Sequence, residues 1–282
     1  MDAEKRKFLE KQALEIRKGI VLEIYSAQSG HPGGSLAIAD VVSYLYFMEM
    51  HVDAQKPEDE KRDRFVLSKG HSVPAVYAAL ALKGYFPKEW LKEFRKLGSR
   101  LQGHPNMRDT PGIDMSTGSL GQGISAACGM ALSAKACGDP YRVYTILGDG
   151  ELEEGQVWEA AMFAAQYKLD NLVAYVDTNG LQIDGKITDV MSQEPFTDTY
   201  AAFGWHVIEI DGHNFDEIEA AYKEAKTVKG KPTVIVAHSI KGKGISYMEN
   251  QASWHGKAPN DEEYAQAVKE LDAALAKLEA QA

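Results

Sequence analysis

Apolar residues recur with the period of a helix at both ends of this chain. Near the start, the apolar positions of one helical face are Leu9, Ala13, Ile16, Ile20 and Ile24. Near the end, the corresponding positions are Tyr264, Val268, Leu271, Leu275 and Leu278. A spacing of three to four residues, in segments rich in good helix formers, predicts an amphipathic helix at each end.

Between these ends, short apolar and β-branched runs alternate with longer segments. The runs cover residues 64–67, 143–147, 172–176, 205–210 and 233–237. Nearly continuous apolar runs of this length are typical of strands buried on both faces of a parallel sheet. The segments with helical character cover residues 72–82, 122–136, 157–167 and 215–226. The alternation predicts an α/β fold with a mostly parallel central sheet flanked by helices.

The length of 282 residues allows one or two domains, and no repeat, Pro-rich linker or low-complexity segment divides the chain. We therefore expect residues 1–282 to form a single domain. The net charge of −10 argues against nucleic acid or an anionic membrane surface as a partner. The charged first twenty residues do not resemble a signal peptide, and no apolar run is long enough to span a membrane.

The two cysteines, Cys128 and Cys137, match no disulfide or metal-ligand spacing. We expect both to be small buried side chains in a reducing compartment, and the protein to be cytoplasmic.

Several acidic residues follow the second apolar run. Gly148-Asp149-Gly150 makes a tight exit turn, and the carboxylates that follow are Glu151, Glu153 and Glu154. A glycine-rich turn between strand and helix commonly holds phosphate on backbone N–H groups, but carboxylates would repel a bare phosphate. A divalent cation between Asp149 and a diphosphate resolves this conflict. The alternative is a solvated acidic start of a helix, which the helix dipole favours.

A second polar strand end follows, where the third apolar run leads to Asn179-Gly180. Asn179 offers an amide oxygen, and irregular backbone after it exposes carbonyl oxygens. One carboxylate, one amide and one carbonyl, with phosphate oxygens and water, match the coordination of Mg²⁺. Ligands of such sheets bind outside the carboxyl ends of the strands, so we expect Asp149 and Asn179 to lie together. The alternative is a simple turn dipeptide.

Four of the eight histidines stand in glycine-containing loops, at His31, His71, His104 and His255. Glycine allows close approach of a ligand, and histidine supplies proton transfer and hydrogen bonds near neutral pH. One such histidine alone is typical of a surface or capping residue, but four together favour a phosphorylated or polyhydroxylated ligand. We expect structural roles for the others, with His213 as a helix cap: His51, His206, His213 and His238.

Two more loops add candidate ligand contacts. The small residues of 116–123 allow a planar ring to pack closely against the chain, although tight packing of helix on sheet is an equal explanation. Lys241 follows the last apolar run and can pair with a diphosphate at the same edge, unless it is simply solvated.

These motifs together resemble the thiamine diphosphate-binding part of transketolase. The matching pieces are GHPGG, LSKGH, GHP, STGSLGQG, GDGELEEGQVWEA, the Asn179 strand end, KGKG and WHG, in the family's order from Gly30 to Gly256. The resemblance implies a three-layer thiamine diphosphate-binding fold. It also implies transfer of a two-carbon ketol unit from a ketose phosphate to an aldose phosphate, in the pentose phosphate pathway.

The resemblance assigns roles to particular residues. Asp149, Asn179 and the carbonyl of Leu181 would bind Mg²⁺ or Ca²⁺. The residues implied around thiamine diphosphate are His71, Gly118, Ser119, Leu120, Gly148, Asp149, Gly150, Glu154, Asn179, Lys241 and His255. The residues implied in catalysis are His31, His71, His104 and His255, with Glu154 communicating between paired active sites.

The chain departs from a full-length transketolase in its extent. The pyrimidine-binding and C-terminal domains do not follow the WHG motif. The resemblance places the activating glutamate and the phosphate-binding arginines of the family in those domains. We expect a partner chain that carries the pyrimidine-binding domain, in an α₂β₂ assembly acting on sugar phosphates.

Other interpretations stay open at this point. They are a split enzyme for an unusual sugar phosphate, 1-deoxyxylulose-5-phosphate synthase, a 2-oxoacid dehydrogenase E1 α-type subunit, and a non-catalytic accessory protein. GHPGG and GDGELEEG favour the transketolase type over the dehydrogenase, and the intact set of polar motifs argues against an accessory role.

Overall fold

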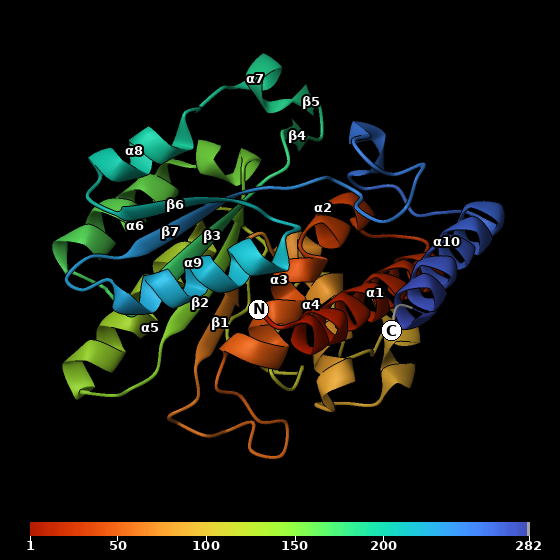
Figure 1. Cartoon of the computed structure of the whole chain (residues 1–282), viewed down its shortest axis with the longest axis horizontal. Coiled ribbons are helices and arrows are strands. Elements are labelled where there is room, and N and C mark those ends of the chain that lie inside the picture. The colour runs from red at the N-terminus through yellow and green to blue at the C-terminus, as the bar shows by residue number, and fades with distance from the viewer. Residues whose placement is uncertain (281–282) are drawn as a thin grey trace.

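A five-stranded parallel sheet forms the centre of the protein, in a computed structural model that describes residues 1–280 (Figure 1). Its strands are β1 (Arg64–Leu67), β2 (Val143–Gly148), β3 (Leu172–Thr178), β6 (His206–Asp211) and β7 (Thr233–His238), in the order β1-β2-β3-β7-β6. All four neighbouring pairs are parallel. The five predicted strands and the α/β fold are therefore confirmed, with strand ends shifted by at most two residues.

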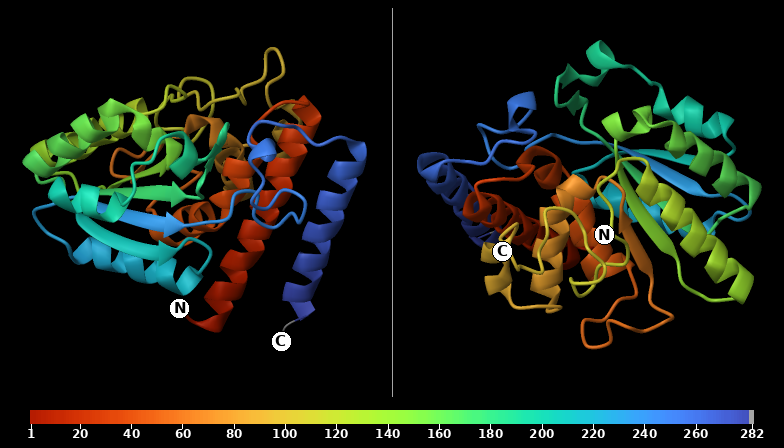
Figure 2. Two further views of the ribbon diagram at one scale, coloured as in Figure 1. Left: turned by 90° about the horizontal axis from the view of Figure 1, so that it is seen from above. Right: turned by 180° about the vertical axis from the view of Figure 1, so that it is seen from behind.

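Helices cover both faces of this sheet (Figure 2). One face carries α3 (Ala39–Tyr44), α4 (Val73–Lys83) and α9 (Phe215–Thr227), with α1 (Ala3–Ala27) behind them and α10 (Asp261–Ala280) packed on α1. The other face carries α5 (Gln122–Cys137), α6 (Gly155–Gln166) and α8 (Phe196–Ala202). The predicted helices at both chain ends and the four predicted between strands are all present.

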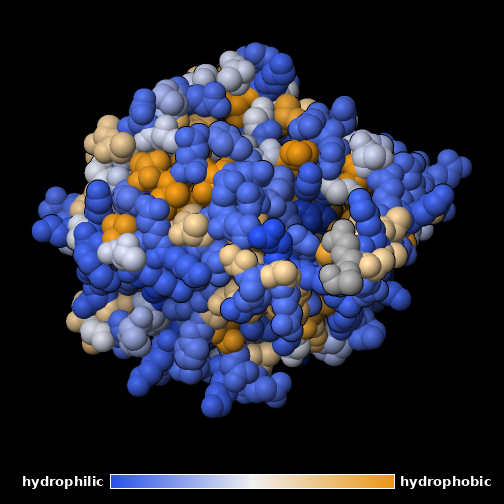
Figure 3. Space-filling view, viewed as in Figure 1, coloured by the Kyte–Doolittle hydropathy of each residue, from blue (hydrophilic) through white to orange (hydrophobic). Residues whose placement is uncertain are grey.

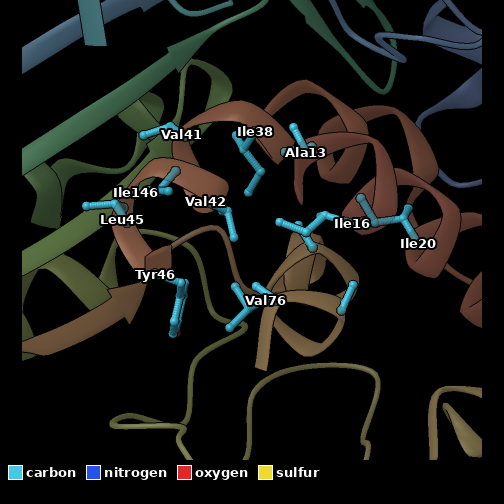
Figure 4. Packing of buried hydrophobic residues seen from close by; sticks show 14 of the residues in the cluster. Ala13, Ile16, Ile20, Ile38, Val41, Val42, Leu45, Tyr46, Val76 and Ile146 are labelled. Atoms are coloured by element: carbon cyan, nitrogen blue, oxygen red, sulfur yellow. The ribbon is translucent and has the colours of Figure 1, made fainter. Parts of the chain in front are cut away.

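The side chains of each strand alternate between the two helical layers. Tyr144 and Ile146 of β2 point into the cluster that includes α1, α3 and α4, whereas Val143 and Leu147 point into the cluster that includes α5 and α6. Because both faces are covered, nearly every strand position is apolar, as parallel sheets require. Figure 4 shows the first cluster, where Ile16 of α1 and Val76 of α4 lie close together.

The sequence pattern did not predict the short helices after His31. These are α2 (Pro32–Ala37), α3, and a π-helical turn at Leu45–Glu49. The residues of α2 and α3 are buried on every side, so they show no alternation of apolar and polar positions. A second unpredicted region is an arm made of β4 (Leu181–Gln182), β5 (Gly185–Lys186) and α7 (Ile187–Val190), which stands away from the sheet (Figure 1).

Two smaller predictions were wrong. His213 does not cap α9; the cap is Asn214, whose side chain accepts the N–H of Asp216 at 3.0 Å. His213 instead accepts the N–H of Ile240 at Nε2 and contacts Asp40 at Nδ1, which joins the β7 loop to α3. Cys128 is buried as expected, but Cys137 is exposed because it ends α5 at the surface.

The topology brings loops that are distant in sequence to one edge of the sheet. Gly148 at the end of β2 is the register partner of Asp177 in β3, and Asp177 is the partner of Ala237 in β7. The exits of three adjacent strands therefore meet at their carboxyl ends. Within residues 1–280, no helix is both long enough and apolar enough to cross a membrane.

We predict that Ile16→Ala lowers the free energy of unfolding by about 2–5 kcal/mol. The Ile16 side chain is fully buried, so removing most of its atoms leaves a cavity in the core. Urea denaturation followed by circular dichroism measures the change. The control is Leu97→Ala, at a fully exposed side chain, where we expect a change within about 0.5 kcal/mol. Equal effects of the two substitutions would contradict this description of the core.

Candidate active site

A cavity of about 260 Å³ opens at the carboxyl edge of the sheet. Eleven of the fourteen site residues predicted from the sequence line it: His31, His71, Gly118, Leu120, Gly148, Asp149, Gly150, Asn179, Leu181, Lys241 and His255. These residues come from seven separate segments of the chain. Four of the segments follow β1, β2, β3 and β7, two lead into α2 and α5, and His255 joins them from the loop before α10.

Asp149 lies at the centre of the cavity wall and is almost fully buried. Its Oδ1 accepts the N–H of Gly150 at 2.9 Å, and its Oδ2 accepts the N–H of Gly180 at 2.7 Å. The carboxylate thus joins the exits of β2 and β3. Burial, together with the charge of nearby Asp177, raises the pKa of Asp149 to about 6. A cation beside this carboxylate would favour its ionised form.

The neighbouring oxygen atoms fit such a cation. Asn179 and Leu181 line the same cavity as Asp149, and they offer an amide oxygen and a backbone carbonyl. Within residues 1–280, no three His, Cys, Asp or Glu side chains group as a metal site. A cation here must therefore use this mixed set of oxygen ligands, which suits Mg²⁺ or Ca²⁺ rather than a softer metal.

Lys241 brings positive charge to this wall of the cavity. Its side chain is almost fully buried, and its Nζ donates to the carbonyl of Leu181 at 2.9 Å. Burial lowers the pKa of Lys241 to about 8, while the negative charge of Asp149 opposes that change. The ammonium group therefore stands beside the oxygen ligands, where it can pair with an anion such as a diphosphate.

Three histidines that line the cavity pack ring against ring. The ring centroids of His31 and His71 are 5.0 Å apart, and His255 lies 5.5 Å and 5.4 Å from them. Burial lowers the pKa of His31 to about 4 and that of His255 to about 3, and it lowers the pKa of His71 well below the usual value. All three are neutral at pH 7.

Neutral imidazoles can each donate one hydrogen bond and accept another. The buried Nδ1 atoms of His31 and His255 have no hydrogen-bond partner in the protein. Buried polar atoms without partners are rare, and here they belong to two residues that line the cavity. This arrangement fits a ligand with hydroxyl or phosphate oxygens.

Three predicted site residues do not line the cavity. His104 is exposed, and its ring packs against Gly118 so closely that a Cβ on Gly118 would come within 3.1 Å of it. Glycine, with its φ of +146°, permits this approach. Ser119 is exposed. Glu154 is also exposed and packs its side chain against Gly121.

Two buried charges at this edge were not predicted from the sequence. Lys69 donates through Nζ to Asp177 Oδ2 at 2.6 Å and to the carbonyl of Gly34 at 3.0 Å. Both charged side chains are almost completely buried. Lys69 stands in the LSKGH motif, and Asp177 is a charged residue inside an otherwise apolar strand. Both features can be read in the sequence, although neither residue was among the predicted site residues.

Glu151, one of the acidic residues of the turn after β2, has a structural role. Its carboxylate accepts the N–H of Gly121 at 2.9 Å, the N–H of Gly148 at 3.1 Å and the hydroxyl of Ser68. It therefore holds together three of the loops that frame the cavity. Glu153 is exposed, as a solvated helix start would predict.

Comparison with known proteins decides the family. Residues 10–277 match the family model described as transketolase, thiamine diphosphate binding domain. The chain belongs to the transketolase family. The resemblance stated from the sequence motifs is thereby confirmed, and the transketolase type is favoured over the dehydrogenase type.

Curated relatives of two kinds are similar to this chain. One is the 6-deoxy-6-sulfo-D-fructose transketolase subunit SqwG of Clostridium sp. (strain MSTE9), 51% identical over 94% of this chain and 96% of that protein. Another is one of the subunits of apulose-4-phosphate transketolase from Phocaeicola vulgatus, 45% identical over 96% of each chain. The transketolase of Homo sapiens is 42% identical, but the match covers 91% of this chain and only 41% of that protein.

Solved transketolases have the same fold. The enzyme from Campylobacter jejuni superposes with a TM-score of 0.87 at 31% identity, over 99% of this chain and 48% of that one. A variant of the enzyme from Pichia stipitis superposes with a TM-score of 0.89 at 34% identity, over 95% of this chain and 40% of that one.

We predict that the stability of Asp149→Asn in EDTA, relative to that of the unchanged chain, increases as the pH rises from 4 to 8. The pKa of Asp149 is raised in the folded state, so the proton it binds stabilises the fold at low pH and is lost above about pH 6. A difference of about two pKa units is worth on the order of 2–3 kcal/mol at pH 8. Urea denaturation at each pH measures it.

The control for this experiment is Glu153→Gln, a change at an exposed carboxylate of the same turn. This surface substitution should change the free energy of unfolding by less than about 0.5 kcal/mol. A stability difference for Asp149→Asn that is constant with pH would contradict the buried, proton-binding state of Asp149.

Proposed function

We propose that this chain is the thiamine diphosphate- and Mg²⁺-binding subunit of a two-chain transketolase. The observation that carries the proposal is the meeting of Asp149, Asn179 and the Leu181 carbonyl with Lys241 in one cavity. Oxygen ligands for a divalent cation and an ammonium group for a diphosphate are what this cofactor requires. Thiamine diphosphate, when bound, supplies the carbanion chemistry of ketol transfer.

The chain's own residues would bind and orient the ligands. Asp149, Asn179 and the carbonyl of Leu181 hold the cation, and Ca²⁺ can replace Mg²⁺ there. Lys241, His71 and the backbone of Gly148 and Gly150 would hold the diphosphate. Gly118 and Leu120, which also line the cavity, would pack beside the cofactor rings.

The histidines would serve the substrate. His31 and His255 line the cavity, so an imidazole nitrogen of each can bind a hydroxyl of the sugar and move a proton there. Because their pKa values are lowered by burial, they enter the reaction neutral. His104 packs against Gly118, and Glu154 lies outside the cavity, in a place suited to contact with another chain.

A partner chain would complete the site. The relatives named as transketolase subunits are covered over 96% of their own length, whereas the transketolase of Homo sapiens is covered over 41%. This difference supports a single domain here, with the pyrimidine-binding and C-terminal domains on a second polypeptide. An α₂β₂ assembly in the cytoplasm stays our prediction.

The arm beside the cavity is a suitable contact for that partner. Ile183 and Met191 are 70% and 59% exposed on it, and Ile183 also lines the cavity. Figure 3 shows apolar side chains among hydrophilic ones where Figure 1 draws β5 and α7. Exposed apolar side chains next to a ligand site are typical of a surface that another chain covers.

The substrate would be a ketose with an anionic tail. The names of the relatives that match over 96% of their length specify 6-deoxy-6-sulfo-D-fructose, a sulfonated ketose, and apulose 4-phosphate, a sugar phosphate. These names favour an unusual sugar over the common intermediates of the pentose phosphate pathway. An accessory role without catalysis is disfavoured, because the oxygen ligands, the lysine and the histidines are all present in one cavity.

We predict that Asp149→Ala abolishes Mg²⁺-dependent binding of thiamine diphosphate to the two-chain assembly, because it removes the only carboxylate in the proposed ligand set. Isothermal titration calorimetry measures the binding, and circular dichroism checks that the sheet is intact. Glu153→Ala is the control on the same turn and should bind as the unchanged protein does. Unchanged affinity in Asp149→Ala would rule out our metal-ligand assignment.

We predict that ketol transfer requires both chains. A coupled assay with the sulfonated ketose, apulose 4-phosphate and fructose 6-phosphate as donors, and an aldose phosphate as acceptor, measures the activity. Little cofactor binding and no transfer are expected of this chain alone. Efficient transfer by the single chain would refute the two-chain proposal, and the preferred donor identifies the substrate.

A further inference from the structure

Asp177 occupies a place that the proposed ligand set does not explain. It is completely buried near the end of β3, two residues before Asn179, and it does not line the cavity. Its Oδ2 accepts from Lys69 Nζ at 2.6 Å and from Asn179 Nδ2 at 2.9 Å. Its Oδ1 accepts from the hydroxyl of Ser239. All the contacts of this carboxylate are therefore made within the protein.

The contact with Asn179 decides which way its amide points. An amide group ends in one donor atom and one acceptor atom, and an ionised carboxylate can only accept. The Nδ2 of Asn179 must therefore face Asp177. Its Oδ1 is left to face the other way, where it accepts the N–H of Leu181 at 3.2 Å beside the cavity.

The ionised state of Asp177 is secured by its neighbours. Burial alone would raise the pKa of this carboxyl, but the Lys69 ammonium and three hydrogen bonds hold the pKa below its usual value. Lys69 is fixed in turn by the carbonyl of Gly34. Asp177 is therefore a rigid acceptor, and Ser239 holds its other oxygen in place.

We propose that Asp177 is a positioning residue, which turns the amide oxygen of Asn179 toward the divalent cation. The identity of the cation rests on the proposed function; the orientation of the amide does not. Outer hydrogen-bond partners of metal ligands commonly fix the orientation of those ligands, and their loss costs about 10- to 100-fold in metal affinity. Asp177 acts here through Asn179, without touching the ion.

The first experiment measures the orientation without any ligand. The full chain is labelled with ¹⁵N-asparagine, and the Nδ2 protons of Asn179 are assigned by their loss in Asn179→Ala. In the unchanged protein, one of these protons should be shifted downfield and exchange slowly, because it is bonded to a carboxylate. Asp177→Asn, whose amide can donate as well as accept, should remove both signatures. Their persistence would overturn the proposal.

Asp177→Asn also leaves the buried Lys69 without its counter-ion, which can unfold the chain. The comparison is therefore repeated in Lys69→Met, where no buried ammonium remains. Asp177→Asn in this background should fold, as judged by its thermal melt, and should again remove the signatures from Asn179. Persistence of the signatures in the double variant would show that Asp177 does not control the amide, and would overturn the proposal.

The second experiment tests the coupling to the cation. Ca²⁺ is titrated into the two-chain assembly at a saturating concentration of thiamine diphosphate, by calorimetry. Asp177→Asn should weaken Ca²⁺ about 10- to 100-fold, and Asn179→Ala should do so at least as much. In the Asn179→Ala background, Asp177→Asn should have no further effect. A further loss of similar size would show that Asp177 acts directly or by general disruption.

Ser239→Ala is the matched control, because it removes a hydrogen bond from the same carboxylate but leaves the bond to Asn179. Its effect on Ca²⁺ affinity should be less than about threefold, well below the range expected for loss of an orienting partner. If the unchanged assembly binds no Ca²⁺ while the amide signatures behave as expected, the proposed function fails and the orientation of Asn179 by Asp177 stands.

Discussion

The buried ion pair between Lys69 and Asp177 is the constraint on which the rest of the site depends. It joins the loop after β1 to β3, and through the carbonyl of Gly34 it also joins α2. Two charges removed from water cost more than their attraction returns unless further hydrogen bonds satisfy them. Here these bonds hold Gly34 and Asn179, two residues of the cavity wall. The ion pair therefore fixes the positions of these segments more than it stabilises the fold.

A second buried carboxylate organises the opposite loops in the same way. Glu151 gathers the hydroxyl of Ser68 and the N–H groups of Gly121 and Gly148. Together, the two carboxylates fix the loops at the carboxyl edge, where the backbone is irregular and apolar packing alone leaves them free. The Asp149 carboxylate, which faces the cavity, is ionised at neutral pH although burial disfavours that state, as its raised pKa indicates. A rigid frame is what allows such states to persist.

The pattern of apolar and polar residues along the chain was sufficient to predict most of the fold. Each strand is a short apolar run because both faces of the sheet are covered, and each long helix keeps one polar face. The pattern failed for α2 and α3, which are buried on every side and so show no period. It also failed for His213, where the nearest polar residue along the chain, Asn214, took the cap. His213 meets Asp40, 173 residues away, instead.

By itself, the sequence determined the α/β fold, the family, and the polar strand ends that converge on one cavity, because these depend on residue type and on short spacing along the chain. Only the tertiary structure showed which buried charges hold the loops around the site in place. Lys69 and Asp177 are 108 residues apart, and Ser68 and Glu151 are 83 apart. Such pairs are selected by the order and register of the strands, which no local pattern encodes. For the same reason, only the structure separated Asp149, buried at the cavity, from the exposed Glu153 and Glu154 a few residues further on.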